Sequence, residues 1–335
     1  MPQRIRSILS VMMIFFCMPA MADRALLYKP EVRAFIHQLV THDHFDQSQL
    51  RRALLEAEYQ PQIIASMDHP YEKKNWDVYQ ALFLTNDRIN NGLVFWRKNQ
   101  AILAQAEKAY GVPAAMIVAI IGIETLYGKH QGQYRVLDAL TTLAFYYPSR
   151  APFFMKELRE YFILCREHHV PISQYLGSYA GAMGQPQFMP SSYRAYARNF
   201  RGYGRTDLMK NDQDVIASVA NYFHAHGWVS GEMIAQQVQV NTSVLSHVNR
   251  DLKTATYPVS SLFHWGVTPR LPQASYPALG GLIELTTQKG LDYWLVFPNF
   301  YVITRYNSSP QYALAAYLLA LQLQQKWRLM HPLAK

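Results

Sequence analysis

The stretch PAAMIVAIIGIETLYG, residues 113–128, carries one acidic side chain, Glu124, and no basic one. Its apolar residues cover nearly every face of a helix, which predicts a helix buried on all sides. Desolvation disfavours the charged form of a carboxyl group in such surroundings and raises its pKa. Glu124 could then hold a proton at neutral pH and deliver it to a glycosidic oxygen. Taken alone, the helix fits better with a structural glutamate bonded to an arginine or to helix-end amides.

A second segment, GSYAGAMGQPQFMPSSY at 177–193, is rich in glycines, amides, hydroxyls and aromatic rings. Sugar sites use these groups, because amides and hydroxyls bond to sugar hydroxyls and glycines let the backbone approach a ligand. The same composition is typical of a long loop rich in turn residues. The segment by itself favours neither interpretation.

A third cluster of aromatic and polar residues, PNFYVITRYN at 298–307, could line the far wall of a cleft. A strand-to-helix junction with half-buried tyrosines is the better interpretation of this segment alone.

The chain as a whole is predicted to be mainly α, with helical spacing over 23–232 and a small β subdomain at 233–298,. Residues 299–335 return to the helical core, and Asn307-Ser308-Ser309-Pro310 would cap and start the last helix. One helix is expected from Asn86 to a stop at Gly111, with Pro113 in the first turn of the next,.

Residues 1–22 have the pattern of a secretory signal peptide: Arg4 and Arg6 precede a short apolar run, which ends at small residues before Asp23,. We expect cleavage after Ala22 and a periplasmic mature chain. A retained membrane anchor, or a lipidated form at Cys17, is the less favoured alternative.

The formal charge of +9 falls to +7 without that segment, which favours an anionic partner,. Nucleic acid, anionic lipid and cell-wall polymer all qualify, but export makes nucleic acid the least suitable. Of the two cysteines only Cys165 would remain, so no intramolecular disulfide is expected, and Cys165 is predicted to be a small core residue,.

Taken together, the segments resemble the B-type lytic murein transglycosylases, glycoside hydrolase family 103. The motifs that carry the resemblance run in family order and cover most of the mature chain: Gly122-Ile123-Glu124-Thr125 with Tyr127-Gly128, Asp138 to Leu143, Gly181 to Tyr193, Ser218 to Phe223, His226-Gly227-Trp228, and Asn299 to Asn307. The resemblance implies a lysozyme-like helical core with a further helical part and a small β part.

The same resemblance implies cleavage of the bond between N-acetylmuramic acid and N-acetylglucosamine in peptidoglycan without water. The muramic 6-hydroxyl closes onto C1 and leaves a 1,6-anhydro end. Glu124 would protonate the leaving oxygen and then, as carboxylate, take the proton of the 6-hydroxyl. Most glycosidases use two carboxylates, whereas the matched catalytic segments hold no second one.

Carried over by position, Ser178 and Gln187 match residues that contact the substrate near the cleavage point. The other matched positions are aromatic or polar cleft residues: Tyr79, Tyr222, Tyr301, Tyr306, Asn299 and Arg305. Arg150 matches one of two adjacent arginines associated with the peptide stem, but Ser149 replaces its neighbour here, which weakens that role.

Some members of this family hold calcium in a loop after the substrate segment. This chain has Asn199, Arg201, Tyr203 and Arg205 at the alternating positions where oxygen ligands are needed, and arginines would repel the ion,. We predict no calcium site, no other metal and no cofactor, since the histidine spacings suggest no metal ligands.

Two alternatives stay open at this stage. A goose-type lysozyme would add water with the same glutamate, and a non-catalytic wall-binding protein would keep the cleft without turnover. Glu124, Ser178 and Gln187 together argue against the second. Glycan strands of peptidoglycan are the expected partner of a monomer, and the sequence does not identify protein partners in the envelope.

Overall fold

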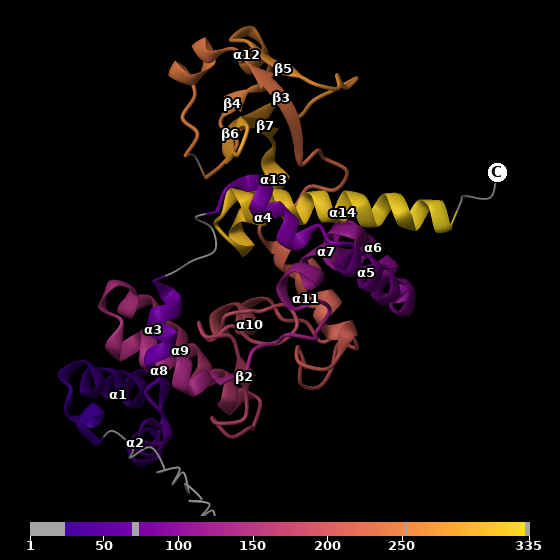
Figure 1. Ribbon diagram of the computed structural model, residues 1–335. Helices are drawn as coiled ribbons and strands as arrows, with labels where there is room; N and C mark the ends of the chain where they lie inside the picture. Colours follow the sequence, from indigo (N-terminus) through magenta and orange to yellow (C-terminus); the bar gives the residue numbers. More distant parts are fainter. Residues whose placement is uncertain (1–23, 69–73, 252, 332–335) are drawn as a thin grey trace, which may run out of the picture. The chain divides into compact units, whose positions relative to one another are not determined.

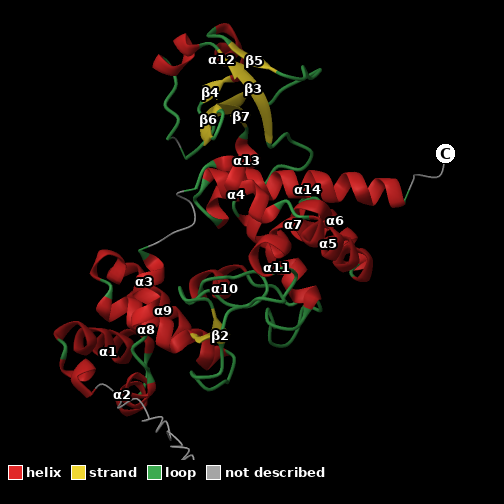
Figure 2. Cartoon of the chain, viewed as in Figure 1, coloured by secondary structure: helices red, strands yellow, loops and turns green. Residues whose placement is uncertain are grey.

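The computed structural model describes residues 24–68, 74–251 and 253–331 (Figure 1). Within these residues α-helices predominate and strands are confined to two small sheets (Figure 2). The prediction of a mainly α chain with a small β region is confirmed. The predicted signal peptide and Cys17 lie outside the described residues.

The chain forms two compact units, one that runs to Tyr59 and one from Gln60 onward. The described elements of the first unit are the 3-10 helix η1 (Arg24–Tyr28), α1 (Pro30–Asp43) and α2 (Gln47–Glu56). Asp46 caps α2, because its carboxylate accepts a hydrogen bond of 2.8 Å from the backbone N–H of Gln49,. Buried apolar side chains of α1 and α2 form the core of this unit.

The second unit holds the other helices. They are α3 (Pro61–Met67), α4 (Trp76–Phe83), α5 (Asn86–Lys98), α6 (Gln100–Tyr110), α7 (Ala114–Thr125), α8 (Val136–Tyr146), η3 (Pro148–Arg150), α9 (Ala151–Glu167), α10 (Pro190–Tyr196), α11 (Asp212–Ala225), η4 (Thr242–Ser246), α12 (Val259–His264), α13 (Pro298–Tyr306) and α14 (Pro310–Met330).

Helix α7 is the predicted buried helix, and every residue from Ala114 to Ile123 is buried. It packs against α5, α6, α11 and α14, which together cover it on all sides. Pro113 lies just before the helix as its N-cap and is not part of the first turn, which corrects the predicted start. At the other end of the helix, Glu124 lies in the last turn and is half-buried.

The ring of Tyr127 explains why two helix positions, Gly92 and Gly122, are glycine. Its hydroxyl would lie 2.4 Å from a Cβ added at Gly92 of α5 or at Gly122 of α7. The hydroxyl donates a hydrogen bond to the backbone carbonyl of Arg88 at 3.0 Å, and the Arg88 guanidinium donates in turn to the carbonyl of Gly122. Tyr127 therefore fills the space between α5 and α7 that the two glycines leave.

The prediction of one helix from Asn86 to Gly111 is wrong in one respect. The chain forms two helices, α5 and α6, that meet at Asn99. The side-chain amide of Asn99 donates to the carbonyl of Phe95 and to the carboxylate of Asp212, 113 residues further along the chain. The predicted stop is confirmed, because Gly111 ends α6 in the left-handed conformation,.

The larger sheet has five antiparallel strands in the order β4-β6-β7-β3-β5. Its strands are β3 (Ala235–Val240), β4 (Tyr257–Pro258), β5 (Val267–Pro269), β6 (Leu279–Thr287) and β7 (Gly290–Val296). One face of the sheet and helix α12 enclose a separate apolar core that contains Val238, Leu262, Leu282, Leu295 and Phe297.

The sheet is joined to the helical part at α4 and α13 (Figure 1). Helix α4 packs against β6. From α13, Tyr301 places its hydroxyl on Gly281 of β6, where an added Cβ would lie 2.0 Å away. All five strands lie within the predicted segment 233–298. The domain boundaries that we placed at the two ends of this segment stay a prediction.

No single helix of the described ranges is long and apolar enough to cross a membrane. Helices α6 and α7 meet the length and composition criteria only as a pair bent by 113°.

Replacing Gly122 by alanine tests the role of the Tyr127 ring. We expect the free energy of unfolding to fall by about 1–3 kcal/mol, because the new methyl overlaps the ring. In a Tyr127→Ala background the same substitution should raise it by up to about 1 kcal/mol, because alanine favours a helix over glycine. Urea unfolding of the four proteins measures both effects. A loss of equal size in both backgrounds would contradict the packing role of Tyr127.

Candidate active site

Glu124 lies at the point where α7 ends and the backbone turns sharply. Two and three residues further on, Leu126 and Tyr127 both have positive φ, of 50° and 61°. The Thr125 hydroxyl accepts a hydrogen bond from the N–H of Gly128 at 2.9 Å and holds the turn together. The carboxyl group of Glu124 is enclosed by protein atoms, yet the residue keeps partial contact with solvent. It is therefore both desolvated and reachable.

Burial raises the pKa of Glu124 from 4.5 to about 7, while a hydrogen bond from Tyr312 acts in the opposite direction,. The Tyr312 hydroxyl donates to Oε1 of Glu124 at 2.5 Å. Among the described residues no carboxylate or cation contributes to this shift. With a pKa near neutrality, Glu124 can both give and take a proton at physiological pH.

Tyr312 was not predicted as a site residue. It lies in the first turn of α14, which begins as the sequence indicated: Ser309 caps the helix and Pro310 is its first residue. Burial first, and the charge of Glu124 second, raise the pKa of Tyr312 well above its ordinary value. Tyr312 therefore stays protonated and donates. It is 188 residues from Glu124, and its local sequence contains no signal for this contact.

The segment 177–193 forms a compact loop between a short strand and a helix. Strand β2 (Leu176–Gly177) pairs with β1 (Tyr134–Arg135), and Met183 bridges to both Gly177 and Phe188. The Ser178 hydroxyl accepts hydrogen bonds from the N–H groups of Ala180 and Ala182, at 3.2 and 3.1 Å. Ser178 is half-buried at the base of this turn.

Gln187 is held in an unusual conformation. Its φ is +51°, a left-handed value that non-glycine residues seldom adopt,. Its amide donates to the carbonyls of Gln131 and Gly184, at 3.1 and 2.9 Å. These two bonds fix the side chain, which stays half-buried at the surface of the loop.

Hydrogen bonds tie this loop to the helix that carries Glu124. The Thr125 hydroxyl donates to the carbonyl of Gln185 at 2.8 Å. The Gln185 side chain donates to Asp212 at 3.0 Å, and Asp212 pairs with Lys98 at 2.7 Å. Because Thr125 follows Glu124 directly, the loop and the acid form one connected unit.

Two predicted tyrosines pack together beside the loop. The rings of Tyr222 and Tyr306 have centroids 4.9 Å apart, and the ring of Phe188 contacts both. Tyr306 donates a hydrogen bond to the carbonyl of Pro186 at 2.5 Å. Burial, and then the charge of Glu124, raise the pKa of Tyr306 well above its ordinary value.

Burial, Glu124 and Tyr306 raise the pKa of Tyr312, and Tyr79 of α4 adds a smaller contribution. The ring of Tyr79 is buried between Trp76 and Phe83, with centroid distances of 6.3 and 5.1 Å.

The remaining predicted residues lie in other surroundings. Asn299 has no exposed surface, and its amide binds the backbone of Val229 and Glu232, so it offers no free group to a substrate. We correct its assignment to a structural role, the joining of α13 to the turn before β3. Tyr301 is buried against β6, and Arg305 is exposed near the end of α13.

Arg150, the predicted stem-binding residue, is exposed in η3. Its guanidinium lies over the rings of Phe153 and Phe154, at 4.7 and 5.2 Å from their centroids. Cation–π stacking therefore accounts for its orientation.

The loop at 199–207, where we predict no calcium site, is held by protein groups. The two carboxylate oxygens of Asp214 accept hydrogen bonds from the N–H groups of Phe200 and Asp207, both at 2.9 Å. Asn199 accepts from the N–H of Arg201. The absence of calcium from this loop stays a prediction.

An apolar helix that ends in one protonable carboxyl group, beside a loop of amides and hydroxyls and a group of tyrosines, is an arrangement suited to an enzyme that cleaves glycosidic bonds. Comparison with known proteins is more specific. Residues 28–321 match the family of the transglycosylase SLT domain.

One relative is the membrane-bound lytic murein transglycosylase B of Escherichia coli K12, which is 40% identical over 300 residues, 87% of this chain and 81% of that protein. The structure of soluble lytic transglycosylase SltB1 from Pseudomonas aeruginosa matches with a TM-score of 0.81 at 42% identity, over 89% of this chain and 99% of that one. SltB3 from the same organism, solved with NAG-NAM-pentapeptide, matches with a TM-score of 0.76 at 30% identity, over 87% and 78% of the two chains.

This chain belongs to the transglycosylase SLT family. The predicted lysozyme-like fold class and the predicted enzyme class, a lytic transglycosylase, are confirmed.

Replacing Glu124 by glutamine should make the protein relatively more stable as the pH rises. The folded pKa of about 7 exceeds the unfolded value of 4.5, so the unfolded chain binds fewer protons and wild-type stability falls between these two pH values,. Glutamine does not titrate. The difference in unfolding free energy should therefore grow by about 1–3 kcal/mol from pH 4.5 to pH 8. Urea unfolding across this range measures it, and a difference independent of pH would contradict the raised pKa.

Replacing Tyr312 by phenylalanine should raise the pKa of Glu124 further, because the lost hydrogen bond favours the charged carboxylate. We expect a change of about one pH unit, since a hydrogen bond to a charged group contributes about 1.5 kcal/mol. The pKa is measured from the pH dependence of kcat/KM. The fall in kcat/KM at alkaline pH, where Glu124 loses its proton, should move to higher pH. Tyr317→Phe, on the same helix, serves as the control. An unchanged or lower pKa in Tyr312→Phe would exclude this role.

Proposed function

We propose that this protein cleaves the β-1,4 bond between N-acetylmuramic acid and N-acetylglucosamine in peptidoglycan without water and leaves 1,6-anhydro-N-acetylmuramic acid ends. The observation that carries the proposal is the environment of Glu124: a half-buried residue at the end of α7 whose carboxyl pKa is raised by burial to about 7. A single group of this pKa can serve as acid and then as base, as a reaction with an internal nucleophile requires.

In this mechanism Glu124 first protonates the glycosidic oxygen, and the bond to C1 breaks. The N-acetyl group of the substrate stabilises C1. Glu124, now a carboxylate, takes the proton of the muramic 6-hydroxyl as that oxygen bonds to C1. Tyr312 stabilises the carboxylate between the two steps, because its hydroxyl donates to Oε1 of Glu124,.

Binding of the sugars is assigned to groups around this acid. Ser178 and Gln187 belong to the loop that hydrogen bonds connect to α7, and they are proposed to contact the sugars on either side of the cleaved bond. Tyr306 and Tyr222 support the loop and shape its aromatic side, and Tyr79 stays a candidate aromatic residue of the cleft. Arg305 and Tyr301 stay candidates for more distant contacts, and Arg150 for the peptide stem.

Peptidoglycan as substrate agrees with the names of the relatives, a murein transglycosylase and an enzyme solved with NAG-NAM-pentapeptide. The E. coli relative is membrane-bound, in line with action in the cell envelope. We further propose that this chain reaches the periplasm through a cleaved signal peptide, acts as a monomer and needs no cofactor.

Mass spectrometry of products released from purified peptidoglycan tests the reaction. Wild type should release anhydro-muropeptides, and Glu124→Gln should release about 10²–10⁴-fold less product, because the sole proton donor is lost. Glu284→Gln, the same change on β6, controls for the substitution itself.

Products heavier by one water would identify a hydrolytic, goose-type lysozyme. Retained activity in Glu124→Gln would exclude Glu124 as the acid, and a wild type that binds strands without releasing product would indicate a binding protein.

A further inference from the structure

A hollow of about 490 Å³ lies beside the substrate loop. Six of the residues that line it are Gln131, Gly132, Leu176, Arg205, Asp207 and Lys210. None of the residues assigned above to sugar binding lines it.

Two cations at this hollow lack a charged partner. Arg205 and Lys210 are exposed, and in the part of the chain that the structure describes neither forms an ion pair. The Arg205 guanidinium donates one hydrogen bond of 3.3 Å, to the carbonyl of His168. Asp207 is the one acid of the lining, and its Oδ1 already accepts from the N–H groups of Met209 and Lys210. The hollow therefore carries a net positive charge.

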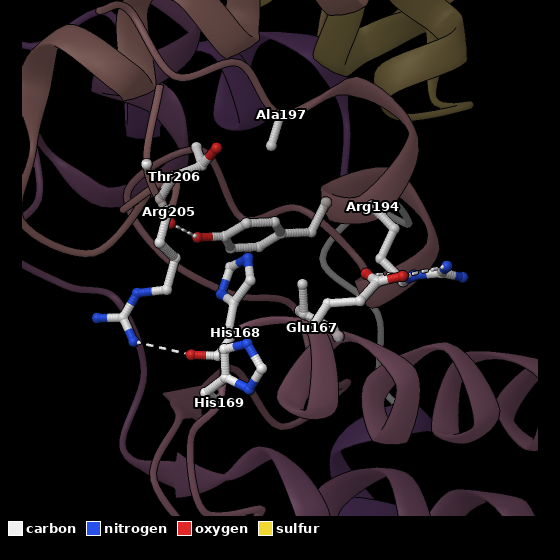
Figure 3. A pocket seen from close by; sticks show the side chains of 10 residues that line it. Glu167, His168, His169, Arg194, Ala197, Arg205 and Thr206 are labelled. Carbon is white, nitrogen blue, oxygen red and sulfur yellow. Dashed lines mark hydrogen bonds and ion pairs between the residues drawn. The ribbon is translucent and has the colours of Figure 1, made fainter. Parts of the chain in front are cut away.

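A neighbouring hollow of about 390 Å³ shows the opposite arrangement (Figure 3). There Arg194 is paired with Glu160 and Glu167. Arg205 belongs to the lining of both hollows, and Figure 3 shows its guanidinium extending away from the pair of Arg194 and Glu167. The unpaired charge is thus available to the first hollow.

The hollow is held in a fixed relation to the catalytic acid. Gln131, in its wall, accepts the hydrogen bond from the Gln187 amide through its backbone carbonyl. The side chain of Gln131 donates to the carbonyls of Gly128 and Met209, at 3.1 and 3.0 Å. Gly128 belongs to the turn that follows Glu124. A ligand bound at Arg205 and Lys210 would therefore be positioned relative to the site of cleavage.

We propose that this hollow binds a carboxylate of the peptide stem carried by the muramic acid, with Arg205 and Lys210 as the binding groups. The proposal rests on the proposed function, because peptide stems enter only with a peptidoglycan substrate. Without a stem, muramic acid keeps one carboxylate directly beside its sugar ring, whereas a stem places carboxylates further from the ring. Guanidinium groups bind carboxylates by charge-assisted hydrogen bonds. Arg205 and Lys210 are thus specificity-determining residues for strands that bear stems.

Binding to soluble glycan oligomers tests the proposal, in a Glu124→Gln background that leaves the oligomers uncleaved. Calorimetry compares oligomers with and without peptide stems, at low and high salt. Arg205→Gln combined with Lys210→Gln removes both charges and keeps polar side chains of similar length. We expect the Kd for stem-bearing oligomers to rise about tenfold and to lose its salt dependence, while the Kd for stem-free oligomers stays the same.

Arg201→Gln is the control for Arg205→Gln alone, since each removes one exposed charge from the same loop and Arg201 lies outside the lining of either hollow. Equal weakening for both oligomers, or none for either, would overturn the proposal, and so would an equal effect of Arg201→Gln. The activity of the wild type on whole peptidoglycan is followed separately. Its failure to form anhydro ends would refute the proposed function, whereas an unchanged Kd would refute only the stem site.

Discussion

Desolvation of one carboxyl group is the constraint on which the site depends. Helix α7 is apolar on all faces and is therefore buried among α5, α6, α11 and α14,. Its last turn leaves this packed environment with a single acid, Glu124, whose pKa rises to about 7. A fully buried acid would be out of reach of a glycan, and a fully exposed one would be ionised. The end of a buried helix satisfies both requirements.

The hydrogen bond from Tyr312 limits the effect of burial. Burial alone would hold the proton on Glu124 more firmly and so oppose the proposed first step, in which Glu124 gives its proton to the glycosidic oxygen. A neutral donor with a raised pKa stabilises the carboxylate and adds no charge of its own. An arginine in the same place would stabilise the carboxylate far more and leave no acid at neutral pH. Tyrosine thus suits a group that has to act in both directions.

The sequence predicts those parts of the fold whose signals are local. The burial of α7, the stop at Gly111 and the start of α14 at Ser309 each follow from a few adjacent residues. The break at Asn99 and the contact of Tyr312 with Glu124 depend on partners more than 100 residues away. Asn299 matched the family pattern, but its position in the motif did not reveal that its side-chain amide is hydrogen-bonded to the backbone of Val229. A motif locates a residue without identifying its partner.

The same distinction applies to charge. The formal charge of +9 favours an anionic partner, yet several arginines are already used inside the fold: Arg194 by Glu160 and Glu167, Arg135 by Asp138, and Arg88 by backbone carbonyls. These side chains contribute to net charge and give little to a ligand. Recognition of a carboxylate therefore depends on where the remaining cations lie. Because Arg205 and Lys210 lie next to the loop that holds Gln187, their position, more than the total charge, would decide which strands the enzyme binds.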